Sequence, residues 1–247
     1  MRTPLFGPTR RVFELAIGEM LWARRTAFMA LAVGAPLLLA AVMRVAVASG
    51  TAVLTVNGSR IGTQAMFETA VSVLYLRFIV PALGVFYGTS LIADEVEDKT
   101  ITYLFTRPIA RGAIVLGKYL AYLLCVVTVV LPSVALVFVI MVPFANMATL
   151  FLTVLADLGI IALGLAAYGA VFLWAGVSFK RPLVGGLVFV FGWEQLALLL
   201  PGYLRYLTIA HYLQPAASSV ISVIVITIAA VFLAMRTIER REYVLEQ

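Results

Sequence analysis

The chain has 247 residues, of which 63% are hydrophobic and 12% are charged, and its mean hydropathy is +1.07. Soluble domains are roughly 45–50% apolar and about 25% charged, so this composition excludes soluble enzymes, disordered chains and collagens. The single cysteine, Cys125, excludes a disulfide framework. We therefore expect an all-α integral membrane protein.

Apolar stretches that could cross the bilayer occur six times. A helix needs about 20 apolar residues to cross a hydrocarbon core of ~30 Å. The uncharged run 119–156 is too long for one crossing, and Pro143 and Asn146 mark a turn within it. The predicted spans are about 27–48, 69–93, 113–142, 148–177, 183–201 and 216–235.

The positions of the basic residues predict the orientation of these spans. Lysine and arginine concentrate on the cytoplasmic side of membrane proteins, and placing both termini in the cytoplasm puts 14 of the 18 basic residues there. The net charge of +6 is then a topology signal and not a footprint for nucleic acid. We expect a multi-pass protein of the cytoplasmic (inner) membrane. The 14 residues are Arg2, Arg10, Arg11, Arg24, Arg25, Lys99, Arg107, Arg111, Lys118, Lys180, Arg181, Arg236, Arg240 and Arg241.

The segment before the first span predicts an amphipathic helix over 10–25. Phe13, Ile17 and Leu21 recur on one face, and basic residues stand at both ends, which is typical of a helix lying in the membrane interface. An ordinary cytoplasmic extension of the first span is the alternative. Cleavage after 46–48 is not expected, because the preceding apolar stretch exceeds the ~7–15 residues of a signal-peptide core.

Residues for catalysis inside the membrane are scarce. A metal site or a nucleophile with its base needs clustered histidines, cysteines or acids, but His211 is the only histidine and Cys125 lies in an apolar run. Residues 112–119 match G-x-x-x-x-G-K, yet Tyr119 stands where Ser or Thr must bind Mg²⁺, and the residues between the glycines are apolar. We expect a non-catalytic chain without a metal or cofactor of its own.

The loop 94–111 differs from the rest of the chain in its charge. Four acids begin it, Ile101, Leu104 and Phe105 follow at helical spacing, and Pro108 ends the pattern. This order predicts a short amphipathic helix parallel to the membrane. A solvated loop that its acids keep out of the bilayer is the alternative.

The order of residues in this loop resembles the signature of the ABC-2 type permeases, the membrane-spanning subunits of ATP-binding cassette transporters. The residues that carry the resemblance are Glu95, Lys99-Thr100-Ile101, Leu104, Arg107-Pro108-Ile109-Ala110-Arg111 and Gly117-Lys118. Lys99 departs from the glycine that is commonest in the family. A later set resembles the NosY-related branch: Trp193-Glu194, Leu200-Pro201-Gly202, Arg205-Tyr206-Leu207 and His211-Tyr212-Leu213.

The resemblance implies how the chain would work. The loop would hold a coupling helix that docks in a cleft of a separate ATPase subunit, with the acids meeting basic residues and an apolar anchor entering the cleft. Two ATPase copies, which carry ATP and Mg, would rock a homodimer or heterodimer of membrane subunits between inward- and outward-open states and export a substrate. The implied coupling residues are Asp94, Glu95, Glu97, Asp98, Lys99, Thr100, Tyr103, Leu104, Phe105, Arg107 and Arg111.

Two functions of other classes remain as alternatives. One is a secondary carrier or channel that works without ATP, for which internal repeats would be typical, and no convincing repeat is present. The other is a passive subunit that anchors a larger membrane assembly, which would not need an exposed coupling helix.

Four charged residues lie within the predicted spans: Arg44, Arg77, Asp157 and Glu194. Each isolated charge costs at least ~2.5–3.5 kcal/mol at the centre of a bilayer. Because two bases and two acids stand at overlapping depths, we expect ion pairs that hold the helices together. A gate or a polar path for substrate is the alternative.

Small residues predict where helices approach closely. Gly84 and Gly88 form a GxxxG pattern in the second span, and the fourth span is dense in glycine and alanine over 159–170. We favour contact between these faces within one subunit, with contact across a dimer as the alternative.

The stretch 200–217 is apolar but interrupted by proline and glycine. It predicts a re-entrant or interfacial segment between the last two spans. Tyr203, Tyr206 and Tyr212 would then lie at headgroup level as anchors.

Overall fold

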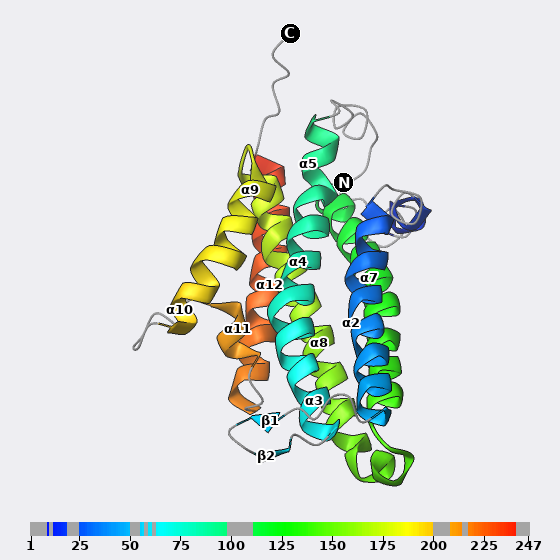
Figure 1. The fold of residues 1–247 in the computed structure, drawn as a ribbon. Coiled ribbons are helices and arrows are strands. Elements are labelled where there is room, and N and C mark those ends of the chain that lie inside the picture. The colour runs from blue at the N-terminus through cyan, green and yellow to red at the C-terminus, as the bar shows by residue number, and fades with distance from the viewer. Residues whose placement is uncertain are drawn as a thin grey trace.

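The computed structural model describes residues 9, 12–18, 25–49, 55–56, 59–60, 63–97, 111–199, 208–213 and 217–240. These residues form a helical bundle (Figure 1), in agreement with the predicted all-α class. The one departure among them is a hairpin of two short antiparallel strands, β1 (Thr55–Val56) and β2 (Ser59–Arg60). In the sequence Asn57 and Gly58 stand between these strands, and an Asn-Gly pair favours two-residue hairpin connections.

Five helices in the described part of the chain are long and apolar enough to cross a membrane. Five of the six predicted spans fall on them. Their apolar segments are Ala27–Ala48, Gln64–Glu95, Arg111–Met141, Phe144–Ser178 and Val220–Arg240. The chain is therefore a multi-pass membrane protein.

Four of these spans are single α-helices: α2 (Arg25–Ala48), α7 (Arg111–Met141), α8 (Phe144–Ser178) and α12 (Ala217–Arg240). The second span instead alternates between α-helical and wider π-helical (η) turns. Its segments are α3 (Thr63–Thr69), η1 (Ala70–Ile79), α4 (Val80–Leu83), η2 (Gly84–Gly88) and α5 (Thr89–Glu97). Pro81 lies between the two π-helical segments, where its missing N–H interrupts regular α-helical bonding.

The predicted span 183–201 falls on a shorter helix than expected. This helix consists of α9 (Pro182–Leu187), η3 (Val188–Glu194) and α10 (Gln195–Leu199). Its apolar part, Pro182–Ala197, is about 24 Å long at 1.5 Å per residue, which is less than the ~30 Å hydrocarbon core. A sixth complete crossing therefore stays a prediction.

The described part of the expected re-entrant stretch lies against the bundle. It consists of α11 (Ile209–Tyr212) and its flanking residues, and Thr208, Ile209 and Leu213 are buried. A Cβ atom added at Gly164, near the middle of α8, would lie 3.2 Å from the Leu213 side chain. This segment therefore packs against the middle of α8 through Leu213, while Ala210, His211 and Tyr212 stay partly exposed.

Helix α8 is the centre of the bundle and packs against α12, α7, η2 and α5. Glycines bring it close to the second span: a Cβ at Gly84 would lie 2.5 Å from the Cβ of Tyr168, and one at Gly88 would lie 2.9 Å from the Gly169 carbonyl oxygen. The small-residue faces thus meet within one subunit, which confirms the favoured expectation.

Buried tyrosines join the long helices by hydrogen bonds. The Tyr122 and Tyr119 hydroxyls of α7 donate to the carbonyl oxygens of Leu165 and Ala166 in α8, at 3.0 and 2.9 Å. Between Tyr75 of η1 and Ser133 of α7 the two hydroxyl oxygens are 3.0 Å apart. These bonds fix the rotation of α7 against both of its neighbours.

One end of the bundle collects several helix ends (Figure 1, top). Here α2 begins, α5 ends, α7 begins and α12 ends. We call it the loop end, because the chain leaves the bundle here after α5 and returns at α7. Helix α2 begins and helix α12 ends at this same end of the bundle.

Candidate functional site: the base of the 94–111 loop and a buried carboxylate

The helices that flank the 94–111 loop carry four of the predicted coupling residues. Asp94, Glu95 and Glu97 lie in the last turns of α5, and Arg111 is the first residue of α7. These acids therefore continue the second span as a helix, whereas the sequence suggested that they belong to the loop. The other predicted coupling residues, Asp98, Lys99, Thr100, Tyr103, Leu104, Phe105 and Arg107, lie outside the described residues, as does the expected coupling helix.

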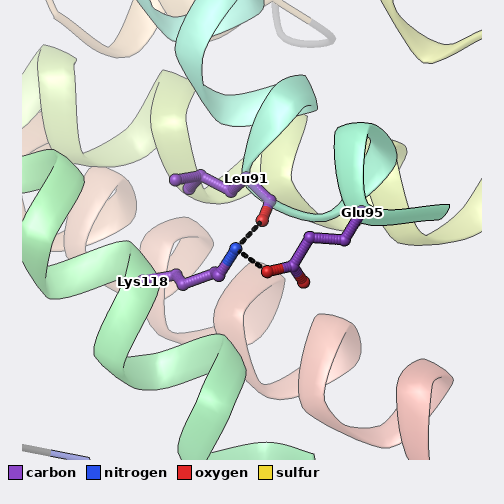
Figure 2. A network of polar contacts seen from close by, with 3 residues as sticks. All are labelled: Leu91, Glu95 and Lys118. Carbon is purple, nitrogen blue, oxygen red and sulfur yellow. Dashed lines mark hydrogen bonds and ion pairs between the residues drawn. The ribbon is translucent and has the colours of Figure 1, made fainter. Parts of the chain in front are cut away.

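Lys118 ties the two flanking helices together (Figure 2). From the second turn of α7 its ammonium pairs with the Glu95 carboxylate and donates to the Leu91 carbonyl oxygen of α5, 3.1 Å away. The two charged side chains are only 10% and 18% exposed. A cation near the last carbonyl groups of a helix is also favourable because it opposes the helix dipole. We call these three residues the Lys118 clamp.

The Lys118 clamp gives Glu95 a partner within the chain. The resemblance placed this acid among those that would meet basic residues of an ATPase, and its carboxylate also pairs with Lys118. This ion pair joins α5 to α7 at the base of the loop. The docking roles of Asp94, Glu95 and Glu97 stay predictions.

Two glycines of α7 bring further elements to the loop end. A Cβ at Gly117 would lie 2.9 Å from the Thr9 carbonyl oxygen and 3.1 Å from the Val12 Cβ, so the N-terminal helical residues 12–18 pack directly on α7. A Cβ at Gly112 would touch Glu239 of α12 at 3.5 Å. Since α7 is helical throughout 112–119, this stretch has no phosphate-binding loop despite its G-x-x-x-x-G-K match.

A buried carboxylate lies farther along the chain, in η3. The Glu194 side chain is 2% exposed. One of its oxygens accepts a hydrogen bond of 2.6 Å from the Tyr168 hydroxyl of α8, and the other accepts one of 3.0 Å from the Ile209 amide at the start of α11. Glu194 thus connects three elements: the short apolar helix, the central helix and the segment that enters the bundle. A π-helical segment at this point is notable because such segments are frequent at functional sites.

The expected ion pairs among the four intramembrane charges are absent from the described parts of the chain. Arg44 and Arg77 are exposed, and Asp157 is half-buried. Glu194 is bound by a hydroxyl and a main-chain amide, and no ion pair joins any two of the four where the structure describes them. The prediction was wrong because it used depth alone: Arg77 points out of the bundle, whereas Glu194 points into it.

Lys118 and Tyr168 are the residues that sequence reasoning missed as site residues. Lys118 is the only basic residue between 112 and 179, and an isolated lysine in a strongly apolar helix signals a buried partner. For Tyr168 the signal is weaker, since only the need of Glu194 for a donor points to it. Neither partner is identifiable from spacing, because the bonded residues are 23 and 26 positions apart.

Comparison with known proteins gives one result that covers most of the chain. A family model described as ABC-2 family transporter protein matches residues 17–193. This range includes both helices of the Lys118 clamp and ends one residue before Glu194. No curated protein matches the chain significantly.

Proposed function

This chain belongs to the ABC-2 family of transporter proteins, and we propose that it is the membrane-spanning permease subunit of an exporter powered by a separate ATPase. Membership supports a transport function carried by the membrane helices, with ATP and Mg held by the partner subunit and no catalysis on this chain. Because members work with an ATPase and a second membrane subunit, the proposed assembly has two permeases, identical or different, and two ATPases.

The observation that carries the proposal is the Lys118 clamp. A force applied to the 94–111 loop would reach α5 and α7 together, because Lys118 joins them at the base of the loop. Both helices pack against α8, so a tilt of the pair would move the centre of the bundle. This arrangement supports a coupling helix between Lys99 and Arg107 on which the ATPase docks.

The proposed orientation places the loop end in the cytoplasm. The excess of basic residues assigned to that side supports this orientation, and an ATPase that uses cytoplasmic ATP requires it. It implies a location in the cytoplasmic membrane, and the resemblance to ABC-2 type permeases favours export as the direction of transport.

We also propose that the sixth span covers about 183–201, and that the re-entrant segment 200–217 begins where this span ends. The Glu194–Ile209 hydrogen bond supports this, because it draws the start of α11 back to η3 inside the bundle. Backbone inside a membrane needs such partners when it is not part of a long helix. The NosY-related branch stays a prediction of the late motif, most of which lies beyond residue 193, where the family match ends.

The proposal is tested by co-purification. The full chain is isolated from its own membranes in mild detergent, and a bound ATPase is identified by its Walker motifs and by its ATP hydrolysis in nanodiscs. Replacing Leu104 and Phe105 with alanine is expected to lower ATPase capture or to uncouple hydrolysis from transport, because both residues would form the apolar anchor.

The matched control replaces Leu31 and Leu38 of α2 with alanine. Each is 70% exposed on the outer face of the bundle, so this pair removes two apolar side chains from α2 and leaves the 94–111 loop unchanged. Unchanged capture and normal transport in the Leu104/Phe105 variant would reject docking on this loop. Transport without any ATPase would favour the secondary carrier.

A further inference from the structure

A cavity of about 510 Å³ lies where α8 ends and α9 begins. Its walls are mostly aromatic and aliphatic, with Phe172 and Trp174 from the end of α8, Phe179 directly after that helix and Phe189 from η3. At the turn between the helices the cavity is bordered by Phe179, Lys180 and Arg181, which are exposed. Its volume is within the ~300–1,000 Å³ of small-molecule sites.

This cavity lies at the level where we expect the membrane to meet water. Helix α8 is a candidate span that ends at Ser178, so Lys180 and Arg181 follow directly on the membrane-crossing segment. The start of α9 lies at the loop end of the bundle (Figure 1). A ligand could therefore enter from the headgroup layer and place its apolar part between Trp174 and Phe189.

Charge distinguishes this cavity from a second one. The second cavity, of about 300 Å³ between α2, the second span and α7, has no charged residue among those that line it. The cavity at the α8–α9 turn has two cations at its opening and no acid among its lining residues. Neither Lys180 nor Arg181 forms a side-chain hydrogen bond or ion pair with any residue that the structure describes.

We propose that this cavity binds an anionic phospholipid, with an acyl chain inside the apolar cavity and the phosphate group between Lys180 and Arg181. Both parts of the ligand follow from the site: the aromatic walls favour a hydrocarbon chain, and the basic pair favours a negatively charged headgroup. A zwitterionic lipid could place its acyl chain in the apolar cavity, but its headgroup carries no net negative charge to balance Lys180 and Arg181.

The test measures which lipids the full chain retains. The purified protein is reconstituted in phosphatidylcholine nanodiscs doped with phosphatidylglycerol, released into detergent and analysed by native mass spectrometry. We expect phosphatidylglycerol to be retained in preference to phosphatidylcholine. Replacing Lys180 and Arg181 with alanine should reduce that preference about 25-fold, because each basic residue near an anionic group contributes roughly fivefold.

A second variant tests the apolar part of the site. Gly185 lines the cavity and is exposed, and a Cβ added there has no neighbour within 4 Å, so Gly185→Leu adds an apolar side chain at the edge of the cavity without disturbing the fold. It should displace the retained lipid although both cations remain. Gly159→Leu is its control, because Gly159 also has open space around it but lies on the exposed face of α8.

The control for charge replaces Arg236 and Arg240 of α12, which are exposed near the loop end, with alanine. An equal loss of phosphatidylglycerol in this control would show general surface attraction and overturn the proposal. Equal retention of the two lipids by the unaltered chain would also overturn it, as would displacement of the lipid by inorganic phosphate alone. If Gly185→Leu instead separates a dimer, the cavity is an interface between copies and the proposal fails.

Discussion

Two carboxylates in the described part of the chain, the part-buried Glu95 and the buried Glu194, are held by different kinds of partner. Glu95 lies at the loop end and pairs with the ammonium of Lys118, and both side chains keep slight exposure. Glu194 is more deeply buried and is bound by a tyrosine hydroxyl and a main-chain amide. Near an interface a cation can balance an acid at moderate cost, whereas a second charge in an apolar interior adds its own desolvation penalty. Neutral donors avoid that second penalty.

The largest effect is expected from breaking the charged site. Lys118→Met leaves Glu95 without its cation in a mostly buried position and should lower the free energy of unfolding by about 3–5 kcal/mol. The measurement is reversible unfolding in detergent by titration with SDS. The double variant Lys118→Met with Glu95→Leu should recover most of this loss, because no unbalanced charge remains.

The control for this prediction is Arg240→Met. Arg240 is exposed at the end of α12, so its loss should change stability by no more than about 0.5 kcal/mol. A similar loss in Arg240→Met and Lys118→Met would show that the clamp adds nothing beyond surface charge.

A smaller effect is expected from moving the tyrosine that binds Glu194. In Gly84→Ala the new methyl group would lie 2.5 Å from the Cβ of Tyr168, so α8 must shift, at about 1–3 kcal/mol. Gly34→Ala is the control, because a Cβ there has no neighbour within 4 Å and alanine favours the helix. Reversible unfolding by titration with SDS should therefore give a lower free energy of unfolding for Gly84→Ala. For Gly34→Ala the free energy of unfolding should be unchanged or slightly higher.

Double variants sharpen this prediction. Gly84→Ala combined with Tyr168→Phe should be non-additive, because the shift of Tyr168 in the first variant weakens the hydrogen bond that the second removes, whereas Gly84→Ala with Lys118→Met should be additive. Additive behaviour in both pairs would contradict a link between Gly84 and the Glu194 site.

The smallest effects are expected from removing single hydroxyl groups. Tyr168→Phe takes a donor from the Glu194 carboxylate and should cost about 2 kcal/mol, as for other bonds to a charged group. Tyr122→Phe removes a bond to the Leu165 carbonyl oxygen and should cost about 0.6 kcal/mol, the average for hydrogen bonds between helices in membranes. Equal losses in the same unfolding assay would argue that Glu194 gains no more from its donor than a carbonyl group does.

Several features were predictable because local composition controls them. Long apolar runs predicted the positions of five helices, since a bilayer requires about 20 apolar residues for each crossing. The contact between the Gly84–Gly88 face and α8 was predictable because small residues let helices approach closely. The two-stranded hairpin was missed, although its signal, Asn57 followed by Gly58, is present in the sequence.

The partners of the buried acids were not predictable in the same way. Depth along a helix indicates which charges share a layer, but it does not say toward which neighbour each side chain points. Arg77 and Glu194 were both expected to take part in ion pairs, yet Arg77 is exposed and Glu194 is buried against Tyr168. The wide turns of η1 and η3 contribute to this outcome, because π-helical turns rotate the side chains away from the positions of a regular α-helix.

Membrane insertion, the crossing helices and the charged loop between α5 and α7 follow from the order of residues, because the bilayer acts on each segment separately through its hydropathy and charge. The Lys118 clamp, the donors of Glu194 and the cavity at the α8–α9 turn depend on how helices far apart in the chain pack together. The geometry of these sites depends on how closely the helices approach one another at glycines. It also depends on the rotation of one helix against another, which no local sequence pattern encodes.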